Sequence, residues 1–572
     1  MILKRWITAP PASRDHLYRF RGMSPFMAQV LINRGFNDPQ DAQKFLYSKD
    51  TTYNPYDMPD MEKAVERIQR AIHNGEKIVV YGDFDADGVT STTLMIQSLR
   101  ALGANAKPYI PHRVDEGYGL NTPALLKLAK AGVTLVITVD CGIRSVEEVL
   151  EGSAAGLDII ITDHHSLGPE LPEAYAVINC KREGYPEPML AGVGVAFKVI
   201  QALIMAERKN QNGNGRYAGV PLHDLFDLVA LGTVADLMPL NHLENRVLVR
   251  RGIEVLNKAQ RPGIRALLEV ATVDPGNVTA MTIGFALGPR INAAGRLDDA
   301  MLAYRLLSAE TLPEARKWAN KLQELNIKRQ DVTRSAQETI SAQVEISEGD
   351  DIPLIFAAHD GILPGVVGLV AGRLTEEYFR PAVVMEKGDM ESRASCRSIP
   401  QFDITSALDQ CSDLLVRHGG HALAAGFTVM NENIQALRER LTSMAHETLS
   451  GQTLSPTLDI DLEVDIHSLS EALVNELAQL EPCGNGNSSP VFMCRNVHVA
   501  DYRTVGKDGK HLKMRISRAS QPPLDAIAFG LGEWVTKMPE RIDMAFNLEI
   551  NEWNGRRTLQ ANIQDIRPAE ET

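Results

Sequence analysis

The sequence lacks the features that mark secreted, membrane-embedded or zinc-stabilised proteins. Its 572 residues include only six cysteines, and no two of them form a C-x-x-C pair. Neither a zinc ribbon nor a disulfide framework is therefore indicated, and scattered thiols suit the reducing cytoplasm. No stretch is apolar for long enough to span a bilayer, and the N-terminus shows no signal-peptide pattern. We expect a cytoplasmic protein without membrane contact.

The chain also lacks the basic excess that is common among nucleic-acid binders. Its formal net charge is −14 at pH 7. Net charge says little about local surface, however, and carboxylates gathered around metal ions count as negative although bound cations neutralise them. The acidity slightly weakens the case for a nucleic-acid-binding function but does not exclude such a function.

The length predicts three or four domains. Apolar runs at 78–81, 106–110, 133–139 and 158–162 alternate with helical stretches such as 90–102, a pattern typical of a parallel α/β sheet. Helical spacing of apolar residues predicts one long helix at about 312–345. We predict a mainly helical segment (1–75), an α/β domain with a Gly-rich loop at 210–215 (76–300), a linking region with the long helix (301–348), a second α/β domain (349–450), and a small OB-like β-barrel (457–572).

The densest chemical signal is the acidic run at residues 83–88, DFDADG, which directly follows an apolar strand. Clustered carboxylates are costly unless a cation compensates them. An EF-hand loop begins in the same way, but it requires Glu at its twelfth position, where this chain has Leu94. An acidic surface turn with helix-capping carboxylates remains an alternative for this run taken alone.

Other metal-binding side chains follow neighbouring apolar strands. Asp140 ends the strand at 133–139, His164 and His165 follow the strand at 158–162, and Asp236 is available to join them. Each alone is more typical of a cap, a turn or a surface residue. In an open parallel sheet, however, ligands bind beyond the carboxyl ends of the strands. Several carboxylates with one or two histidines suit Mg²⁺ or Mn²⁺, and two such ions are a common device for phosphoryl hydrolysis.

These motifs resemble those of the DHH phosphoesterases. The four segments concerned are 83–88 (DFDADG), 139–142 (VDCG), 163–165 (DHH) and 232–236 (GTVAD). Residues 288–297 (GPRINAAGRL) resemble a further motif of the RecJ exonuclease branch, and residues 419–427 (GGHALAAGF) resemble the motif of the accessory DHHA1 domain. The likeness covers essentially the whole chain in the right order. It implies a parallel-sheet DHH domain and a second α/β DHHA1 domain, joined by the long helix.

The resemblance implies 5′→3′ hydrolysis of single-stranded DNA to mononucleotides with two Mg²⁺ or Mn²⁺ ions, in recombination and repair. It also implies partnership with single-strand-binding protein and a RecQ-type helicase, and we expect a monomer. Asp140 would bridge the ions and take part in catalysis, and His165 would face the scissile phosphate. Smaller family members have a histidine where this chain has Tyr81, so Asp83 is kept as a ligand. The implied metal ligands are Asp83, Asp85, Asp87, Asp140, His164 and Asp236.

Substrate contacts are expected from both α/β domains. The positions that the resemblance implies, or that suit phosphate and close backbone approach, are Arg113, Arg290, Ser395, Arg397, Gly420 and His421. The turn at 419–421 would let backbone approach the strand. In the barrel, a basic strip at 501–520 interleaved with Tyr502 fits single-strand binding, although a solvated hairpin explains it nearly as well.

Two other functions fit parts of the sequence. The first is a DHH-family oligonucleotidase or small-phosphoester phosphatase, against which the barrel and the long helix argue. The second is a non-catalytic scaffold on a DHH fold, in which metal ligands can be lost. Every candidate ligand is present here, which favours an active enzyme.

Overall fold

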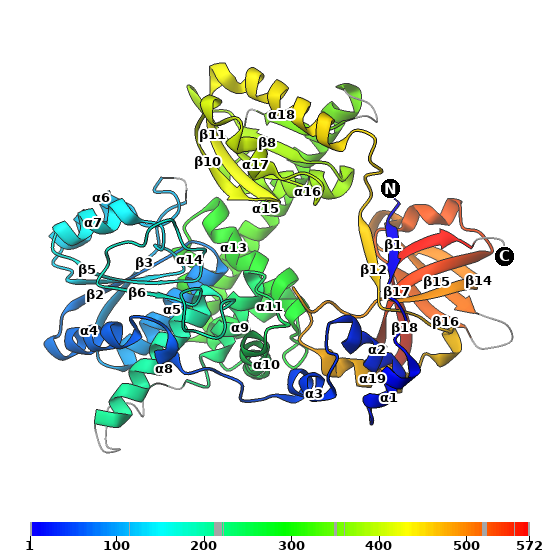
Figure 1. The fold of residues 1–572 in the computed structure, drawn as a ribbon, viewed down its shortest axis with the longest axis horizontal. Helices are drawn as coiled ribbons and strands as arrows, with labels where there is room; N and C mark the ends of the chain where they lie inside the picture. Colours follow the sequence, from blue (N-terminus) through cyan, green and yellow to red (C-terminus); the bar gives the residue numbers. More distant parts are fainter. Residues whose placement is uncertain are drawn as a thin grey trace. The chain divides into compact units, whose positions relative to one another are not determined.

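The structure, a computed structural model, describes residues 3–113, 115–210, 220, 222–347, 352–359, 361–517, 523–553 and 555–569. The chain forms two compact units (Figure 1). Asp50–Leu454 form the larger unit, and Met1–Lys49 join Ser455–Thr572 in the smaller one. The segment 1–75, treated as one piece in the sequence analysis, is therefore divided near residue 49. None of the described helices combines the length and apolar character that a membrane crossing requires.

A five-stranded parallel sheet organises the first part of the larger unit, with the strand order β3-β2-β4-β5-β6. Its strands are β2 (Lys77–Gly82), β3 (Asn105–Tyr109), β4 (Leu135–Val139), β5 (Asp158–Asp163) and β6 (Ala176–Asn179). Side chains alternate between two apolar layers, because successive residues of a strand point to opposite faces. Helices α6 (Thr122–Lys130) and α7 (Val146–Ala154) cover one face, and α4 (Met61–Asn74), α5 (Ala86–Ala101) and α8 (Gly192–Asn210) cover the other (Figure 1). The predicted parallel α/β sheet is confirmed.

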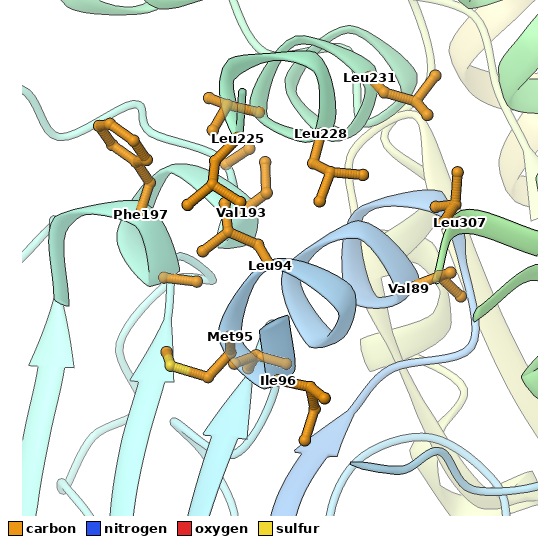
Figure 2. Close-up of a cluster of buried hydrophobic side chains, with 14 of the residues drawn as sticks. Val89, Leu94, Met95, Ile96, Val193, Phe197, Leu225, Leu228, Leu231 and Leu307 are labelled. Carbon is orange, nitrogen blue, oxygen red and sulfur yellow. The ribbon is translucent and has the colours of Figure 1, made fainter. Parts of the chain in front are cut away.

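Helix α5 lies in the middle of the apolar core. Its residues Val89 and Leu94 pack among Val193 of α8 and Leu228 and Leu231 of α9 (Phe226–Ala235) (Figure 2). Burial of each such side chain contributes about 1.5–3 kcal/mol. The core therefore fixes α5, and with it the acidic loop at the start of this helix.

The sequence analysis places the start of this helix too late, at Thr90. In the structure α5 begins at Ala86, inside the acidic run. The Asp85 carboxylate caps the helix, because it accepts hydrogen bonds from the backbone N–H groups of Asp87 at 2.9 Å and Gly88 at 3.0 Å. The predicted loop at 210–215 lies, from residue 211 onward, outside the described residues.

A helical layer continues from α9 to the second α/β region. It comprises α10 (Leu243–Lys258), α11 (Pro262–Ala271), α12 (Ala280–Thr282), the π-helical turn η3 (Ile283–Leu287), α13 (Gly288–Leu297) and α14 (Met301–Leu307). Helix α15 (Leu312–Ser347) has 36 residues, which confirms the predicted long helix. Its Leu322 belongs to the core of the first sheet and its Ile340 to a core of the second, so one helix is anchored in both.

The second α/β region contains a mixed five-stranded sheet with the order β10-β11-β9-β8-β7. Its strands are β7 (Ile355–His359), β8 (Ala382–Glu386), β9 (Glu391–Arg397), β10 (Leu415–His421) and β11 (Ala424–Met430). Only β7 and β8 pair in parallel. The accompanying helices are α16 (Val367–Tyr378), α17 (Ile404–Asp409) and α18 (Ile434–Leu449). The predicted second α/β domain is confirmed.

The smaller unit contains the predicted barrel. Its strands are β14 (Phe492–Val505), β15 (His511–Ser517), β16 (Leu524–Ala528), β17 (Arg541–Trp553) and β18 (Arg556–Pro568), and pairing of β14 with β17 closes it. The short elements β13 (Leu462–Glu463) and α19 (Glu471–Leu477) precede the barrel.

The N-terminal segment carries a strand that the sequence analysis missed. Strand β1 (Arg5–Thr8) pairs in parallel with β12 (Thr457–Ile460). The Trp6 indole N–H donates to the Asp565 carboxylate at 2.7 Å, and the Arg567 guanidinium lies 4.2 Å from its ring centre. The helices α1 (Arg14–Arg19), α2 (Pro25–Asn33) and α3 (Pro39–Tyr47) follow. This pairing explains why residues 1–49 belong with the barrel.

Candidate metal centre and substrate-contacting residues

The predicted ligands converge at one edge of the parallel sheet. Asp83 follows β2, Asp140 follows β4 and His164 follows β5, and these three strands are neighbours in the sheet. Asp236 comes from a helix, as the C-terminal cap of α9. Asp83, Asp140 and His164 are buried, whereas the Asp236 side chain is 27% exposed. The edge thus holds a nearly enclosed acidic cluster with one open side.

A side chain of α13 and backbone groups of α8 hold the acidic loop in place. The backbone N–H of Ala86 donates to the Asn292 side chain of α13 at 2.7 Å. The Asp87 carboxylate accepts from the backbone N–H groups of Gly192 at 2.6 Å and Val193 at 2.9 Å, at the start of α8. A helix N-terminus favours negative charge, so α8 stabilises the ionised form of Asp87.

The ligand atoms form overlapping groups that suit two ions. Potential ligand atoms lie within 4.8 Å of one another in three sets: Asp83 with Asp85 and Asp140, Asp87 with His164 and Asp236, and Asp140 with His164 and His165. The Nε2 atom of His164 lies 3.1 Å from an Asp140 oxygen and 3.4 Å from an Asp236 oxygen. Asp140 takes part in two sets, so its position suits a carboxylate shared by two ions.

Polar atoms without partners support a divalent-metal site. Among the described residues, Oδ1 of Asp83, Oδ1 of Asp140, Nε2 of His164 and Oδ2 of Asp236 are buried and accept or donate no hydrogen bond. Buried polar atoms without partners are rare, and several carboxylates around one imidazole are a donor set for Mg²⁺ or Mn²⁺. The residues present therefore fit the two ions that the sequence predicts.

Burial and mutual repulsion disfavour the charged carboxylates. Burial, followed by the charge of Asp85, raises the pKa of Asp87 to about 7. Burial, followed by the charges of Asp87 and Asp85, raises the pKa of Asp236 to about 9. The pKa values of Asp83 and Asp140 are also raised well above their ordinary range, chiefly by burial. Without a bound cation, protons must neutralise part of the negative charge of these carboxylates.

We expect the stabilisation of the fold by Mn²⁺ to grow as the pH rises. The pKa values of Asp87 and Asp236, about 7 and about 9, exceed the ordinary 3.8, so the metal-free fold holds protons that the unfolded chain has released. Proton binding to these carboxylates stabilises the metal-free fold, and this stabilisation is lost as the pH rises. A bound cation replaces the protons and keeps the fold stable at high pH. The Tm difference between Mn²⁺ and chelator should be several degrees larger at about pH 8.5 than at about pH 6. An equal difference at both pH values would contradict this assignment.

Asp163 orients both histidines. Its Oδ1 accepts from the backbone N–H groups of His164 at 2.7 Å and His165 at 3.0 Å, and from Nδ1 of His165 at 2.8 Å. Burial alone would lower the pKa of His165, but this hydrogen bond and the nearby carboxylate charges outweigh it and raise the pKa. Burial, followed by the charge of His165, lowers the pKa of His164 to about 3. His164 is therefore neutral, as a metal ligand must be, whereas the contact with Asp163 favours the protonated form of His165.

Tyr81, which stands where smaller family members have a histidine, points away from the cluster. It is fully buried, its hydroxyl donates to the Gly119 carbonyl at 3.1 Å, and it accepts from the Asn121 side chain at 3.0 Å. No ligand comes from this position, and Asp83 with Asp85 and Asp140 supplies the first set instead.

A cluster of arginines lies beside the first ligand set. The Arg113 guanidinium lies 4.7 Å from the ring centre of Phe84, the residue between Asp83 and Asp85. Arg296 of α13 donates to the Gly365 carbonyl, next to α16, at 2.9 Å. Burial, followed by the charges of Arg113 and Arg329, lowers the pKa of Arg296 to about 10.

The second α/β domain adds Arg397 to this cluster. The charge of Arg397 also acts on Arg296, and its guanidinium donates to the Ser395 hydroxyl at 3.1 Å. Both side chains extend from β9 toward Gly368 of α16. Arg329 of α15 has a buried Nε without a partner among the described residues. Within the described part of the chain these guanidinium groups form no ion pair with a carboxylate, and gathered guanidinium groups suit a phosphate.

Arg290 and the glycine motif lie in settings that the sequence did not predict. Arg290 donates to the Gln323 side chain and to the Ala286 carbonyl, both at 2.7 Å. The segment expected as a turn at 419–421 is the end of strand β10, and the turn follows it. Gly420 has φ +156°, and a Cβ there would collide with Ala424 and Ala425 of the paired strand. The hairpin itself therefore requires this glycine, and His421 is exposed at the end of β10.

The basic strip of the barrel is only partly as predicted. Arg503 pairs with Lys513 across β14 and β15, and Asp501 pairs with Arg515, so these residues share one face. Tyr502 pairs with the buried Met514 on the other face. It is therefore not interleaved with the basic side chains, because neighbouring residues of a strand point to opposite faces. Arg518 lies outside the described residues.

Four supporting residues escaped the sequence analysis. Three of them lie inside motifs of which other residues were predicted as site residues: Asp163, Asn292 and Arg296. The motifs could therefore have identified these three residues as well. Gly192 lies in none of these motifs, yet a Cβ there would collide with the Asp140 side chain. The close approach of α8 to the metal cluster requires glycine at this point.

Comparison with known proteins accounts for all three regions. The model of the DHH family N-terminal domain matches residues 77–233, that of the DHHA1 domain residues 351–447, and that of the RecJ OB domain residues 460–565. The single-stranded-DNA-specific exonuclease RecJ of Bacillus subtilis (strain 168) is 39% identical over 557 residues, which cover 96% of this chain and 68% of that protein. The RecJ of Escherichia coli (strain K12) is 35% identical over 564 residues, which cover 96% of each.

Solved structures of RecJ proteins also resemble this chain. RecJ from Thermus thermophilus in complex with Mn²⁺ matches with a TM-score of 0.83 and 28% identity, and the match covers 99% of this chain and 80% of that one. A structure of exonuclease RecJ bound to manganese is 32% identical with a TM-score of 0.59, and it covers 69% of this chain and 98% of that one.

Fold and site together define a phosphoesterase of the DHH class, with a DHHA1 domain and an OB domain after it. Within that class, the chain belongs to the RecJ family of single-stranded-DNA-specific exonucleases. The resemblance stated from the motifs is thereby confirmed. The roles of individual site residues stay predictions.

Proposed function

We propose that this protein removes mononucleotides from the 5′ end of single-stranded DNA with two Mg²⁺ or Mn²⁺ ions, in DNA recombination and repair. One observation carries the proposal: the ligand set Asp83, Asp85 and Asp140 adjoins the set Asp87, His164 and Asp236, because an Asp140 oxygen lies 3.1 Å from Nε2 of His164, and both lie beside a cluster of guanidinium groups. The metal-bound relatives support the choice of ions. We assign the chemistry to residues 76–300, end recognition to 349–450 and strand holding to 457–572.

Each ligand set would hold one of two ions that act on the same phosphate. Asp83, Asp85 and Asp140 would hold one ion, and Asp87, His164 and Asp236 the other. Asp140 would be shared, because its carboxylate lies 3.1 Å from Nε2 of His164. Two such ions activate water and neutralise the charge of a phosphodiester. The bond that breaks joins phosphorus of the second nucleotide to the 3′ oxygen of the first, and the 3′ oxygen takes a proton.

His165 is placed to manage that proton. Asp163 holds the Nδ1 atom of His165 and raises the pKa of its ring, which favours a ring that carries a transferable proton on Nε2. The side chain is 42% exposed at the open side of the cluster, where a phosphate can reach it. We assign His165 to the scissile phosphate and its leaving oxygen.

The arginine cluster supplies the recognition of an end. A terminal phosphate carries more charge and more acceptor oxygens than an internal diester, which guanidinium donors exploit. Arg113 lies on the metal-binding domain and Arg397 with Ser395 on the next one, so a terminal phosphate between them would set the first diester over the ligands. We assign Arg290, Gly420 and His421 to more distant contacts with the strand.

Other properties follow from composition and family. All six cysteines are described by the structure, and all are buried and outside any disulfide, which suits the reducing cytoplasm. We propose action as a monomer, with single-strand-binding protein and a RecQ-type helicase as partners. The non-catalytic scaffold is disfavoured because every predicted ligand joins the cluster, and the small-substrate phosphatase is disfavoured by the OB domain.

The test is a digestion assay with end-labelled substrates. Single- and double-stranded DNA and RNA should be incubated with Mn²⁺, Mg²⁺ or chelator. We expect release of labelled mononucleotide from 5′-labelled single-stranded DNA with either cation and none with chelator. Release first from the 3′ end, internal cutting, or equal digestion of RNA would each overturn a part of the proposal.

A further inference from the structure

Asn245, in the first turn of α10, joins two loops that lead to the second ligand set, which contains Asp87 and Asp236. The Asn245 side chain is fully buried, and its Nδ2 donates to the Met189 carbonyl at 2.6 Å and to the Pro239 carbonyl at 3.3 Å. Met189 lies in the loop before α8, whose first backbone N–H groups hold the Asp87 carboxylate. Pro239 lies in the loop that begins at Asp236. One amide group therefore ties together the supports of two carboxylates of the same set.

The spacing of these two carboxylates depends on a close approach of α8 and α9. A Cβ at Gly232 of α9 would lie 2.7 Å from Oδ1 of Asp87 and 2.8 Å from the Val193 side chain of α8. Burial, followed by the charge of Asp87, raises the pKa of Asp236, so the two carboxylates repel each other in the absence of a cation. A tie between the two loops opposes that repulsion and keeps the carboxylates close enough to bind one ion.

The start of α10 is held firmly, so it can serve as a fixed point for both loops. The Glu244 carboxylate pairs with the Lys198 ammonium of α8 at 2.6 Å, and both side chains are fully buried. Glu244 also accepts a hydrogen bond from the Tyr185 hydroxyl at 2.6 Å. Nδ1 of His242 lies 2.8 Å from a carboxylate oxygen of Glu187. These contacts fix the helix end itself, and the amide next to them extends the anchorage to the two loops.

The Asn245 amide has hydrogen bonds on one side only, which distinguishes a positioning role from a role in stability alone. Among the residues that the structure describes, Oδ1 of Asn245 is one of the buried atoms that accept no hydrogen bond. A buried acceptor without a partner destabilises a fold, and an apolar side chain would avoid that cost. The amide nitrogen, in contrast, has two hydrogens and can hold two carbonyl groups at once. The donor side of this residue is therefore the side that matters.

We propose that Asn245 is a positioning residue for the second ion: its amide sets the spacing of the Asp87 and Asp236 carboxylates so that both face one cation. This inference rests on the proposed function and deepens it. Asn245 touches neither the ions nor the strand. Without its amide, the two carboxylates should move apart, which weakens the binding of the second ion. The first ion should be unaffected, because neither loop carries Asp83 or Asp85.

The test is a calorimetric titration of the full chain with Mn²⁺ alone, without DNA. The wild type should bind two ions, and Asn245→Ala should weaken one of them by roughly tenfold and leave the other unchanged. Asn245→Ser, whose hydroxyl has a single hydrogen to donate, should cause a smaller loss and keeps the test decisive if the alanine variant does not fold. In cleavage of single-stranded DNA, the Mn²⁺ concentration for half-maximal rate should rise by a similar factor, and saturating Mn²⁺ should restore the rate.

Asn257→Ala is the matched control. Asn257 lies on the same helix, about 18 Å from Asn245 along its axis. It holds a loop in the same way, because it donates to the Val278 carbonyl at 3.1 Å and accepts from the Val278 backbone N–H at 2.7 Å. This variant should lower the Tm and leave both Mn²⁺ affinities unchanged.

Three outcomes would overturn the positioning role while the exonuclease function stands. They are a wild-type titration curve for Asn245→Ala and Asn245→Ser, an equal weakening of both ions, and the same weakening of one ion in Asn257→Ala. A wild-type protein that binds two Mn²⁺ ions but does not cut single strands would instead overturn the proposed function, and with it the role of the second ion in strand cleavage.

Discussion

Asp140→Asn should lower the hydrolysis of single-stranded DNA by roughly 10²–10³-fold or more, the scale seen when one major electrostatic group of an active site is deleted. Asp140 has φ +62° and its backbone N–H donates to the Thr162 carbonyl at 3.0 Å. Asparagine tolerates this conformation, so the backbone should stay in place while the shared charge is lost. Initial rates in Mn²⁺ and in Mg²⁺ provide the measurement.

Thermal unfolding separates this loss of chemistry from a loss of fold. In chelator, Asp140→Asn should unfold at the wild-type temperature or above, because one of several mutually repelling buried carboxylates is gone. Asp158→Asn is the control: Asp158 begins β5, the strand that His164 follows, but it lies at the opposite end of that strand and pairs with Arg67. It should keep normal turnover. Near-normal turnover of Asp140→Asn with an ordinary melting curve would rule out the two-ion assignment.

The order of the elements and the convergence of the ligands could be predicted from sequence because both depend on local patterns. Nearly continuous apolar runs predict buried parallel strands, and the polar residues that end such strands must share one edge. Asp83, Asp140 and His164 meet for this reason. The rule that strand ends share one edge does not apply to Asp236, because this residue follows a helix. Only the motif resemblance predicted that Asp236 belongs to the site.

The errors arose where tertiary structure overrides local preference. The helix predicted to start at Thr90 begins at Ala86, inside the acidic run, because carboxylates at a helix N-terminus are stabilising. Strand β1 was missed because its partner β12 lies more than 400 residues away in the chain. A count of basic and aromatic residues in 501–520 ignored strand alternation, which puts Tyr502 and Arg503 on opposite faces.

Supporting residues were the least predictable part of the site. Gly192 is required because a helix approaches Asp140 closely, and nothing in the local sequence shows that approach. The arginine cluster draws on α13, α15 and β9, and its members become neighbours only when the long helix brings the two α/β domains together. Arg113 was predicted from the resemblance and Arg397 from its pairing with Ser395, whereas Arg296, on which the charges of both act, was missed.

Arg397→Ala should slow the first cut of a 5′-phosphorylated single strand far more than that of a 5′-hydroxyl strand. Loss of one charge-assisted hydrogen bond costs roughly 1.5–3 kcal/mol, or about one to two decades in kcat/KM if the contact persists in the transition state. Arg397 is half-buried and donates only to Ser395 and to the Cys396 carbonyl among the described residues, so its guanidinium keeps donors for a phosphate. A hydroxyl end offers no such acceptor and should be cut at nearly the wild-type rate.

The measurement must isolate the first cut, because hydrolysis between phosphorus and the 3′ oxygen leaves a 5′-phosphate on the shortened strand. A hydroxyl end is therefore converted into a phosphate end after one step, and bulk digestion would hide the difference. Single-turnover release of the first labelled nucleotide avoids this. Arg393→Ala removes an equal charge from the same face of β9 two rows away and should leave the preference intact. Equal slowing of both substrates by Arg397→Ala would assign Arg397 to domain packing and contradict a terminal-phosphate pocket. Selective slowing of the phosphorylated strand would mean that the second α/β domain binds the terminal phosphate and so sets the cut one nucleotide from the end.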